Sequence, residues 1–253
     1  MNTAIAPDPA PPHAVPDAAP STADLSVRFQ AVRGFTRTLV ETMETEDFVV
    51  QTMEDVSPTK WHLAHTSWFF ETFVLSPHLP GYAPFHPQYA YLFNSYYVQA
   101  GERHCRDRRG YLSRPTVADV MAYRAHVDAH MTQLLDGDVP DEVAALVEVG
   151  LHHEQQHQEL LVTDIKHVFS VNPLRPVFRE GTGDPGQGEA SPLSWIAFEG
   201  GVHEIGHQDE GFHFDNEAPR HKTYVQPFRM ASRLVTCGEF MEFMADGGYR
   251  RPE

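Results

Sequence analysis

Hydrophobic residues recur every three or four positions along four segments of the chain, which is the pattern of amphipathic α-helices. These segments cover residues 21–43, 57–77, 115–135 and 141–171. Helices joined in this way are most simply arranged as an antiparallel bundle, because each then buries its apolar face against its neighbours. We therefore predict a four-helix bundle, and the core of such a bundle is a common place for a metal site.

Local signals mark where these helices begin and end. Ser57 is expected to cap the second helix, with Pro58 in its first turn, a position that tolerates the missing N–H of proline. Asn172 and Pro173 should end the fourth helix, since a residue that precedes proline disfavours helical backbone. In the third helix we expect an inner face formed by Val117, Val120, Met121 and Val127.

The helical pattern is lost in two places. Residues 77–115 contain many tyrosines and no long helical period, which favours an ordered loop of the kind that often carries function. A Gly/Pro/Ser-rich stretch follows the fourth helix, and beyond it WIAFEGG and HKTYVQPFRMA predict short strands. The predicted chain is therefore mainly α, with a disordered tail (1–20), a helical domain (21–175), a linker (176–193) and the start of an α+β domain (194–253).

Composition and charge narrow the classes of function. The chain has 253 residues, with 19 basic against 35 acidic residues, and the net charge of −16 has the wrong sign for general nucleic-acid binding. Cys105 and Cys237 are too far apart in sequence for a CxxC motif, so a reducing, cytoplasmic setting is expected. No segment has the roughly 20 apolar residues of a membrane span, and the Ala/Pro-rich start lacks the features of a signal peptide.

Two histidines of the fourth helix are spaced to bind one metal ion. His153 and His157 are four residues apart, so their side chains lie one above the other on the same helix face. His152 points about 100° away from that face, and His167 lies about 15 Å further along the helix axis. Neither can share the ion with this pair.

A third ligand must come from another helix. The second helix offers His62 and His65, which lie three apart on adjoining faces, and spacing alone does not choose between them. Imidazole nitrogens suit iron, zinc, copper or nickel. With no carboxylate in the set, the charge of the metal would favour anionic ligands at the open positions.

The segment HEQQH at 153–157 also fits the HExxH pattern of zinc proteases, in which Glu154 would be the general base. The extended form of that pattern has glycine three residues and a ligand six residues after the second histidine. Leu160 and Thr163 occupy these positions here. A protease is therefore a weak alternative.

Longer motifs resemble a known group of bacterial enzymes. SPTKWHLAHTSWFFETFVL and the later HHEQQHQELLVTDIKHVFSVNPLRP resemble the ergothioneine-biosynthesis sulfoxide synthases, which are non-haem iron enzymes. EGGVHEIGH and FDNEAPRHKTYVQPFRMASRLVTCGEFMEFMADGGY resemble the opening of their second domain, which is similar to formylglycine-generating enzymes. The resemblance extends from about Arg28 to the end of the sequence.

This resemblance implies a fold, a metal and a reaction. The first domain of these enzymes is a DinB-like four-helix bundle that binds Fe(II) through three histidines, and the matching residues here are His65, His153 and His157. His62 then becomes a residue that supports the ligands or the fold. The enzymes use O2 to join γ-glutamylcysteine or cysteine to hercynine, a trimethylated histidine, as a sulfoxide. Gln156 matches a residue placed near hercynine.

The loop between residues 77 and 115 contains a cluster of arginines in an otherwise acidic protein. Guanidinium groups bind carboxylates through two parallel hydrogen bonds, so Arg103 and Arg106 are candidates for binding the amino-acid end of the thiol. A solvated basic loop that pairs with surface acids is the alternative.

The sequence departs from the family at its end. The catalytic tyrosine and much of the hercynine pocket come late in the family sequence, and nothing follows Glu253 here, so no catalytic residue is identified beyond the metal ligands. We expect a shortened form that binds metal better than it catalyses, with uncovered apolar side chains around Phe228 and Phe240. Cys237 stands where the family usually has asparagine.

Two other functions are also compatible with the sequence. One is a zinc-dependent thiol transferase on the same bundle, which would need no O2. The other is an inactive metal-binding remnant.

Overall fold

The computed structural model describes residues 22–95, 101–181, 190–208 and 211–251. The chain divides into two compact units, the first ending at Glu180 and the second beginning at Gly181. The first unit is helical and the second contains all the strands of the described residues. This arrangement confirms a mainly α fold followed by a smaller α+β part. The predicted tail of residues 1–20 lies outside the described residues.

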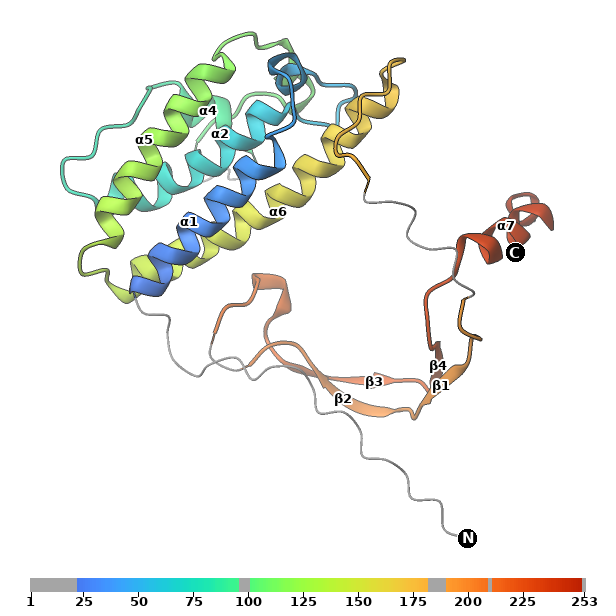
Figure 1. Cartoon of the computed structure of the whole chain (residues 1–253). Coiled ribbons are helices and arrows are strands. Elements are labelled where there is room, and N and C mark those ends of the chain that lie inside the picture. Colours follow the sequence, from blue (N-terminus) through green and yellow to red (C-terminus); the bar gives the residue numbers. More distant parts are fainter. Residues whose placement is uncertain (1–21, 96–100, 182–189, 209–210, 252–253) are drawn as a thin grey trace. The chain divides into compact units, whose positions relative to one another are not determined.

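Four long helices form the first unit, and each lies where the hydrophobic pattern predicts one (Figure 1). They are α1 (Thr22–Leu39), α2 (Thr59–Phe70), α5 (Val117–Leu135) and α6 (Asp141–Val171). Helix α2 packs against both α5 and α6, and α1 packs against α6 and α5. Every residue of α2 is buried, so it is the innermost helix of the unit.

Helix α2 begins one residue later than predicted. Pro58 occupies the N-cap position, and Ser57 does not cap the helix. The polar groups of Ser57 are used elsewhere, because its N–H donates to Asp164 Oδ2 at 2.8 Å and its hydroxyl accepts from Arg109 Nη1 at 2.9 Å. The same helix continues beyond Phe70 as a π-helical turn, Glu71–Leu75, and a last turn, α3 (Ser76–His78).

Helix α5 begins with a capping box in which Thr116 and Asp119 exchange hydrogen bonds. Val120 and Val127 are fully buried, as predicted. Met121 was expected on the inner face but is 36% exposed, because it follows Val120 by one residue and so points about 100° around the helix. Its side chain lines a surface pocket of the helical unit.

The loop between residues 77 and 115 contains short helices that the sequence pattern did not predict. They are α4 (Tyr89–Phe93) and a 3-10 turn (Arg106–Tyr111), and a further 3-10 turn, Thr45–Val49, lies between α1 and α2. Glu71 anchors the loop, since its carboxylate accepts hydrogen bonds from Tyr82 Oη at 2.6 Å, Tyr123 Oη at 2.7 Å and the Phe85 N–H at 3.0 Å. Two loop tyrosines, Tyr96 and Tyr97, lie outside the described residues.

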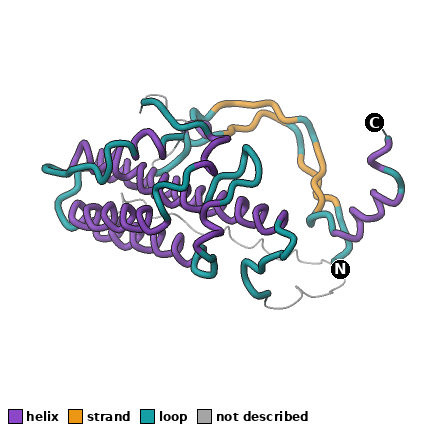
Figure 2. Tube along the Cα trace, turned by 90° about the horizontal axis from the view of Figure 1, so that it is seen from above, coloured by secondary structure: helices purple, strands orange, loops and turns teal. Residues whose placement is uncertain are grey.

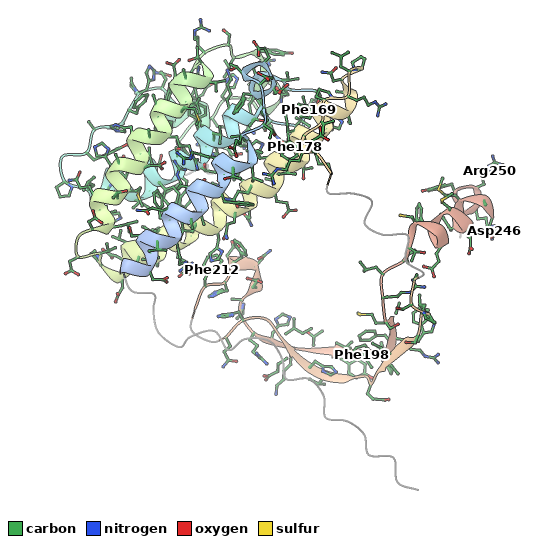
Figure 3. All side chains as sticks on the ribbon, viewed as in Figure 1. Phe169, Phe178, Phe198, Phe212, Asp246 and Arg250 are labelled. Carbon is green, nitrogen blue, oxygen red and sulfur yellow. The ribbon has the colours of Figure 1, made fainter. Side chains whose placement is uncertain are left out.

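The first residues of the predicted linker pack on the helical unit. Thr42 Oγ1 donates to the Phe178 carbonyl oxygen at 2.8 Å, and the Phe178 ring packs against the apolar cluster that contains Phe169 (Figure 3). The two units divide after Glu180, so residues 176–180 continue the helical unit. Residues 182–189 of the predicted linker lie outside the described residues.

The second unit consists of paired strands and a short helix (Figure 2). Strand β1 (Trp195–Phe198) pairs antiparallel with β4 (Phe228–Ala231), and β2 (Gly201–Ile205) pairs antiparallel with β3 (His221–Val225). Helix α7 (Cys237–Ala245) and two 3-10 turns, Asp215–Glu217 and Gly248–Arg250, complete it. As expected, Phe228 and Phe240 are exposed, at 42% and 48%. No helix among the described residues is both long and apolar enough to cross a bilayer.

A buried ion network joins three of the long helices. Glu154 of α6 is fully buried and accepts hydrogen bonds from Arg33 Nη1 of α1 at 2.9 Å and Arg124 Nη2 of α5 at 2.5 Å. Thr36 Oγ1 donates a third bond at 2.6 Å. Burial by itself would raise the pKa of the Glu154 carboxyl, but the two guanidinium groups outweigh burial and lower that pKa to about 2.

We predict that Glu154→Gln lowers the free energy of unfolding by about 3–5 kcal/mol, because it leaves the buried Arg124 guanidinium without its carboxylate partner. Glu148→Gln is the matched control on the same helix. Its partner Arg28 is 32% exposed, so losing that pair should cost less than about 1 kcal/mol. Urea denaturation followed by circular dichroism compares the two, and equal losses would contradict the assigned role of Glu154.

Candidate metal centre

Three histidine side chains meet between α2 and α6. His65, His153 and His157 each offer one ring nitrogen, and these three atoms lie within 4.8 Å of one another. The ring centroids are 4.9 Å apart for His65–His153 and 4.6 Å apart for each of the other two pairs. It is the one group of three or more potential metal ligands found in the part of the chain that the structure describes. The helix geometry thus selects His65, not His62, as the third member.

All three rings are suited to remain neutral. Burial lowers the pKa of His65 and of His157 well below the usual value, and the neighbouring histidines of the cluster lower both further. Burial also lowers the pKa of His153 to about 4. A neutral imidazole keeps one lone pair, which is the form that binds a metal. The cluster is therefore prepared for a cation at neutral pH, and the donor set fits a transition metal.

His65 is held rigidly by its neighbours. Its ring is stacked between those of Trp61 and Trp68, at centroid distances of 4.5 and 5.3 Å and interplanar angles of 15° and 13°. These tryptophans share its helix face because they lie four residues before it and three after it. The Arg109 guanidinium lies 3.4 Å above the Trp61 ring and extends the stack.

A hydrogen bond fixes which nitrogen of His65 is available. His65 Nδ1 lies 2.5 Å from the backbone carbonyl oxygen of Phe93, at the end of α4. A carbonyl only accepts, so Nδ1 carries the hydrogen and donates it. In the neutral ring the lone pair is then on Nε2. The amino-acid sequence gives no signal for Phe93 in this role, since a backbone carbonyl contact does not depend on residue type.

His62 lies beside the cluster and contacts one member of it. Its Nδ1 is 2.9 Å from His157 Nδ1, and its Nε2 is 2.9 Å from Asp164 Oδ2. Burial is the largest cause that lowers the pKa of His62, so this ring also stays neutral. Asp164 was missed by the sequence analysis, although it follows His157 by seven residues, two helical turns, and so shares its face of α6.

The other polar residues of α6 face elsewhere. His152 lies 3.9 Å from Glu148, and His167 Nδ1 lies 2.8 Å from Thr52 Oγ1. Glu154 is bound by two arginines in the core, so its carboxylate cannot act as the general base that the protease alternative requires. The geometry of the HEQQH segment therefore opposes that alternative.

The three residues predicted to bind substrate occupy different environments. Gln156 is exposed on α6, next to His157 in sequence. Arg103 Nη1 donates to the Ser95 carbonyl oxygen at 2.6 Å, and Ser95 also accepts from Arg109 through its hydroxyl at 3.3 Å. Arg106 Nη2 donates to the carbonyl oxygen of Asp55. Both arginines thus bind backbone carbonyls. Arg103 binds that of Ser95, two residues after Phe93, whose carbonyl oxygen accepts from His65.

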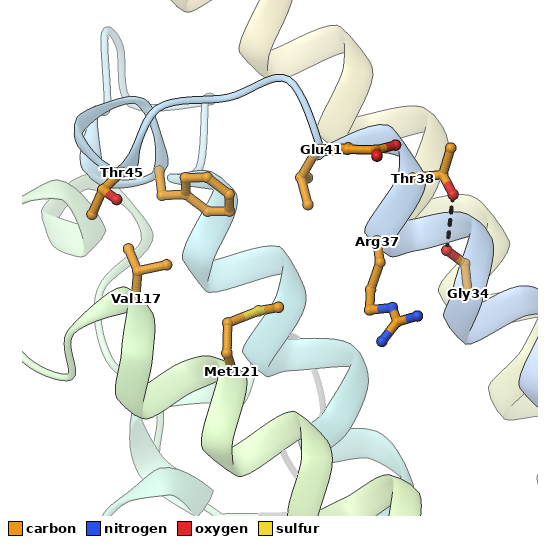
Figure 4. Close-up of a pocket in the computed structure, with 9 residues that line it drawn as sticks. Gly34, Arg37, Thr38, Glu41, Thr45, Val117 and Met121 are labelled. Carbon is orange, nitrogen blue, oxygen red and sulfur yellow. Dashed lines mark hydrogen bonds between the residues drawn. The ribbon is translucent and has the colours of Figure 1, made fainter.

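A pocket of about 500 Å³ lies elsewhere on the helical unit (Figure 4). It is lined by residues of α1 and the turn that follows it, of the 3-10 turn at 45–49 and of α5, including the charged Arg37 and Glu41 and the apolar Val117 and Met121. None of the three histidines lines it. This pocket is therefore separate from the candidate metal centre.

A helical unit with a buried histidine triad, followed by a small strand-containing unit, defines the class of the protein. Residues 28–161 match the DinB superfamily, and the chain belongs to this superfamily. Residues 183–253 match the sulfatase-modifying factor enzyme 1-like domain.

Three curated relatives of the chain have the same name. The hercynine oxygenase of Mycolicibacterium smegmatis is 29% identical over 78% of this chain and 44% of its own length, and that of Mycolicibacterium thermoresistibile is 28% identical over 78% and 42%. The hercynine oxygenase of Mycobacterium tuberculosis is 26% identical over 77% of this chain and 44% of its own length. The chain thus spans less than half the length of these relatives. The matches confirm the resemblance drawn from the sequence motifs.

The buried histidines predict a pH dependence for the metal-free protein. The pKa of His153 falls from 6.5 when exposed to about 4 in the fold, so the folded state binds fewer protons than the unfolded state between these values. The free energy of unfolding should therefore decrease as the pH falls from 6.5 towards 4, by up to about 1.4 kcal/mol per pH unit for this group.

Urea denaturation at several pH values measures this slope. The His153→Gln variant should have a shallower slope than the parent protein, because it lacks the titrating ring. The control His152→Gln changes the neighbouring, partly exposed histidine and should alter the slope less. Equal slopes in the parent and the His153→Gln variant would contradict the prediction.

Proposed function

We propose that the chain carries the metal centre of a non-haem iron(II), O2-dependent sulfoxide synthase of ergothioneine biosynthesis. The substrates would be hercynine and a cysteine-type thiol, either γ-glutamylcysteine or cysteine. The observation that carries the proposal is the convergence of the buried His65 and His153 with the partly buried His157, in a chain whose curated relatives are named hercynine oxygenase. In the overall reaction, thiol, hercynine and O2 give the sulfoxide and water, so O2 accepts four electrons, two for the C–S bond and two for the S–O bond.

The residues of the site fit an iron ion. His65, His153 and His157 would hold it through neutral nitrogens and leave further coordination positions open. Bound iron would supply the acidity that converts the thiol to a thiolate and the redox chemistry with O2. Because the triad contributes no negative charge, an anionic thiolate would be favoured beside it. The rigid stack around His65 would keep the ligand set in place during turnover.

Two parts of the surroundings would bind the organic substrates. Gln156 is exposed beside His157, so its amide is open to hydrogen bonds with hercynine. Arg103 binds the Ser95 carbonyl, two residues after the Phe93 carbonyl that accepts from His65. Its guanidinium would bind the carboxylate of the thiol, with Arg106 as a second candidate. We expect these small molecules as the partners, and a cytoplasmic setting for the reaction.

The test is anaerobic loading of the full chain with Fe(II), followed by addition of hercynine, thiol and O2. We expect a sulfoxide product by mass spectrometry, together with O2 consumption. His153→Ala should reduce turnover at least about 100-fold and abolish tight Fe(II) binding, because it removes one of three ligands. His152→Ala is the matched control, since its ring lies outside the triad, and it should keep both properties.

Other outcomes would point elsewhere. Undiminished turnover by His153→Ala would contradict the proposed centre. Thiol transfer with zinc and without O2 consumption would favour the zinc-dependent thiol transferase. Tight Fe(II) binding without turnover of any thiol would favour a metal-binding protein without this activity.

A further inference from the structure

We propose that His62 and Asp164 form a positioning relay that holds His157 in the tautomer able to bind a metal. This inference rests on the metal centre proposed above and adds two residues that act on it without contacting the ion. The relay crosses between two helices, from His157 on α6 to His62 on α2 and back to Asp164 on α6.

The geometry of the relay is continuous. His157 Nδ1 and His62 Nδ1 are 2.9 Å apart, and His62 Nε2 and Asp164 Oδ2 are also 2.9 Å apart. Asp164 follows His157 by two helical turns, so the His62 ring spans the distance between them along α6. Asp164 Oδ2 accepts a second hydrogen bond, from the Ser57 N–H at 2.8 Å, just before the start of α2. The carboxylate is therefore held at a fixed position.

The positions of the hydrogens follow from the chemistry of the end group. A carboxylate only accepts, so His62 Nε2 must carry a hydrogen and donate it to Asp164. The neutral His62 ring then has its lone pair on Nδ1, and this atom accepts from His157. His157 Nδ1 therefore carries the hydrogen, and the lone pair of His157 is on Nε2, the nitrogen left for a metal.

The Asp164 carboxylate is needed because His62, the middle residue of the relay, can form its hydrogen bonds in either direction. A backbone carbonyl, such as that of Phe93 beside His65, always accepts and so sets the tautomer of its histidine by itself. An imidazole can donate or accept through either nitrogen. Without Asp164, His62 could equally donate from Nδ1 to His157, which would place the hydrogen of His157 on Nε2 and block metal binding.

Ring nitrogen NMR tests this assignment directly on the metal-free chain. In protein labelled with 15N-histidine, nitrogens with and without a hydrogen give separate signals, and His157→Gln identifies the signals of His157. We expect the hydrogen on Nδ1 of His157 and on Nε2 of His62. In Asp164→Leu, no acceptor remains for His62 Nε2, so the hydrogens of both rings should no longer be confined to these nitrogens.

Metal affinity gives a second, independent readout. We expect Asp164→Leu to weaken Fe(II) binding about 10- to 100-fold, measured anaerobically by competition with a chromophoric chelator. Glu159→Gln is the matched control, because it removes one negative charge from an exposed position of the same helix. It should leave both the tautomers and the Fe(II) affinity unchanged. A role in the fold alone would not move the ring nitrogen signals.

The outcomes separate this inference from the proposed function. A parent protein with the hydrogen of His157 on Nε2 would overturn the relay without any variant being needed, even if Asp164→Leu failed to fold. Unchanged tautomers and unchanged Fe(II) affinity in a folded Asp164→Leu variant would also overturn it. Failure of the parent chain to bind Fe(II), with the expected tautomers present, would overturn the proposed function and still support the relay.

Discussion

The burial of the Glu154 carboxylate between two arginines is the interaction on which the helical unit and its site both depend. Glu154 is fully buried, so α6 can rotate about its axis only by moving this charge away from Arg33 and Arg124. Removing an ion from such partners costs several kcal/mol. The rotation of α6 is thereby fixed, and with it the direction in which the neighbouring His153 points.

Two polar stripes run along the same stretch of α6 and explain its unusual composition. Glu154 and Gln158, four residues apart, face α1, where Gln158 Nε2 donates to the Val32 carbonyl oxygen at 3.0 Å and to Thr36 Oγ1 at the same distance. His153 and His157, also four residues apart, face the histidine of α2. The stripe toward α1 fixes the rotation of α6, and the stripe toward α2 contributes two histidines to the candidate metal centre. Gln155 and Gln156, which lie between these pairs in sequence, are exposed.

Electrostatics and stacking give the site a consistent character. Burial keeps the three rings neutral, and the nearby Arg109 adds positive charge that further disfavours protonation of His65 and His157. The stack of Arg109, Trp61, His65 and Trp68 restricts the ring of His65 before any ligand is bound. Such a preformed and neutral cluster pays little to reorganise when a cation binds, and its environment favours negatively charged ligands on that cation.

The sequence by itself determined the positions of the long helices, the pair of His153 and His157, and the resemblance that added His65. The helices and the histidine pair depend on the helical period, which a single sequence displays, whereas His65 was implied by the resemblance of the motifs. It could not choose between His62 and His65 by spacing, because every residue of α2 is buried and both faces of the helix meet protein. The sequence pattern also placed Met121 on the inner face of α5 and Ser57 at the N-cap of α2. Residues on neighbouring elements decide both features, and a single sequence does not show these neighbours. Only the tertiary structure showed that His62 contacts His157 and Asp164, because hydrogen bonds between helices depend on how α2 and α6 are rotated relative to each other.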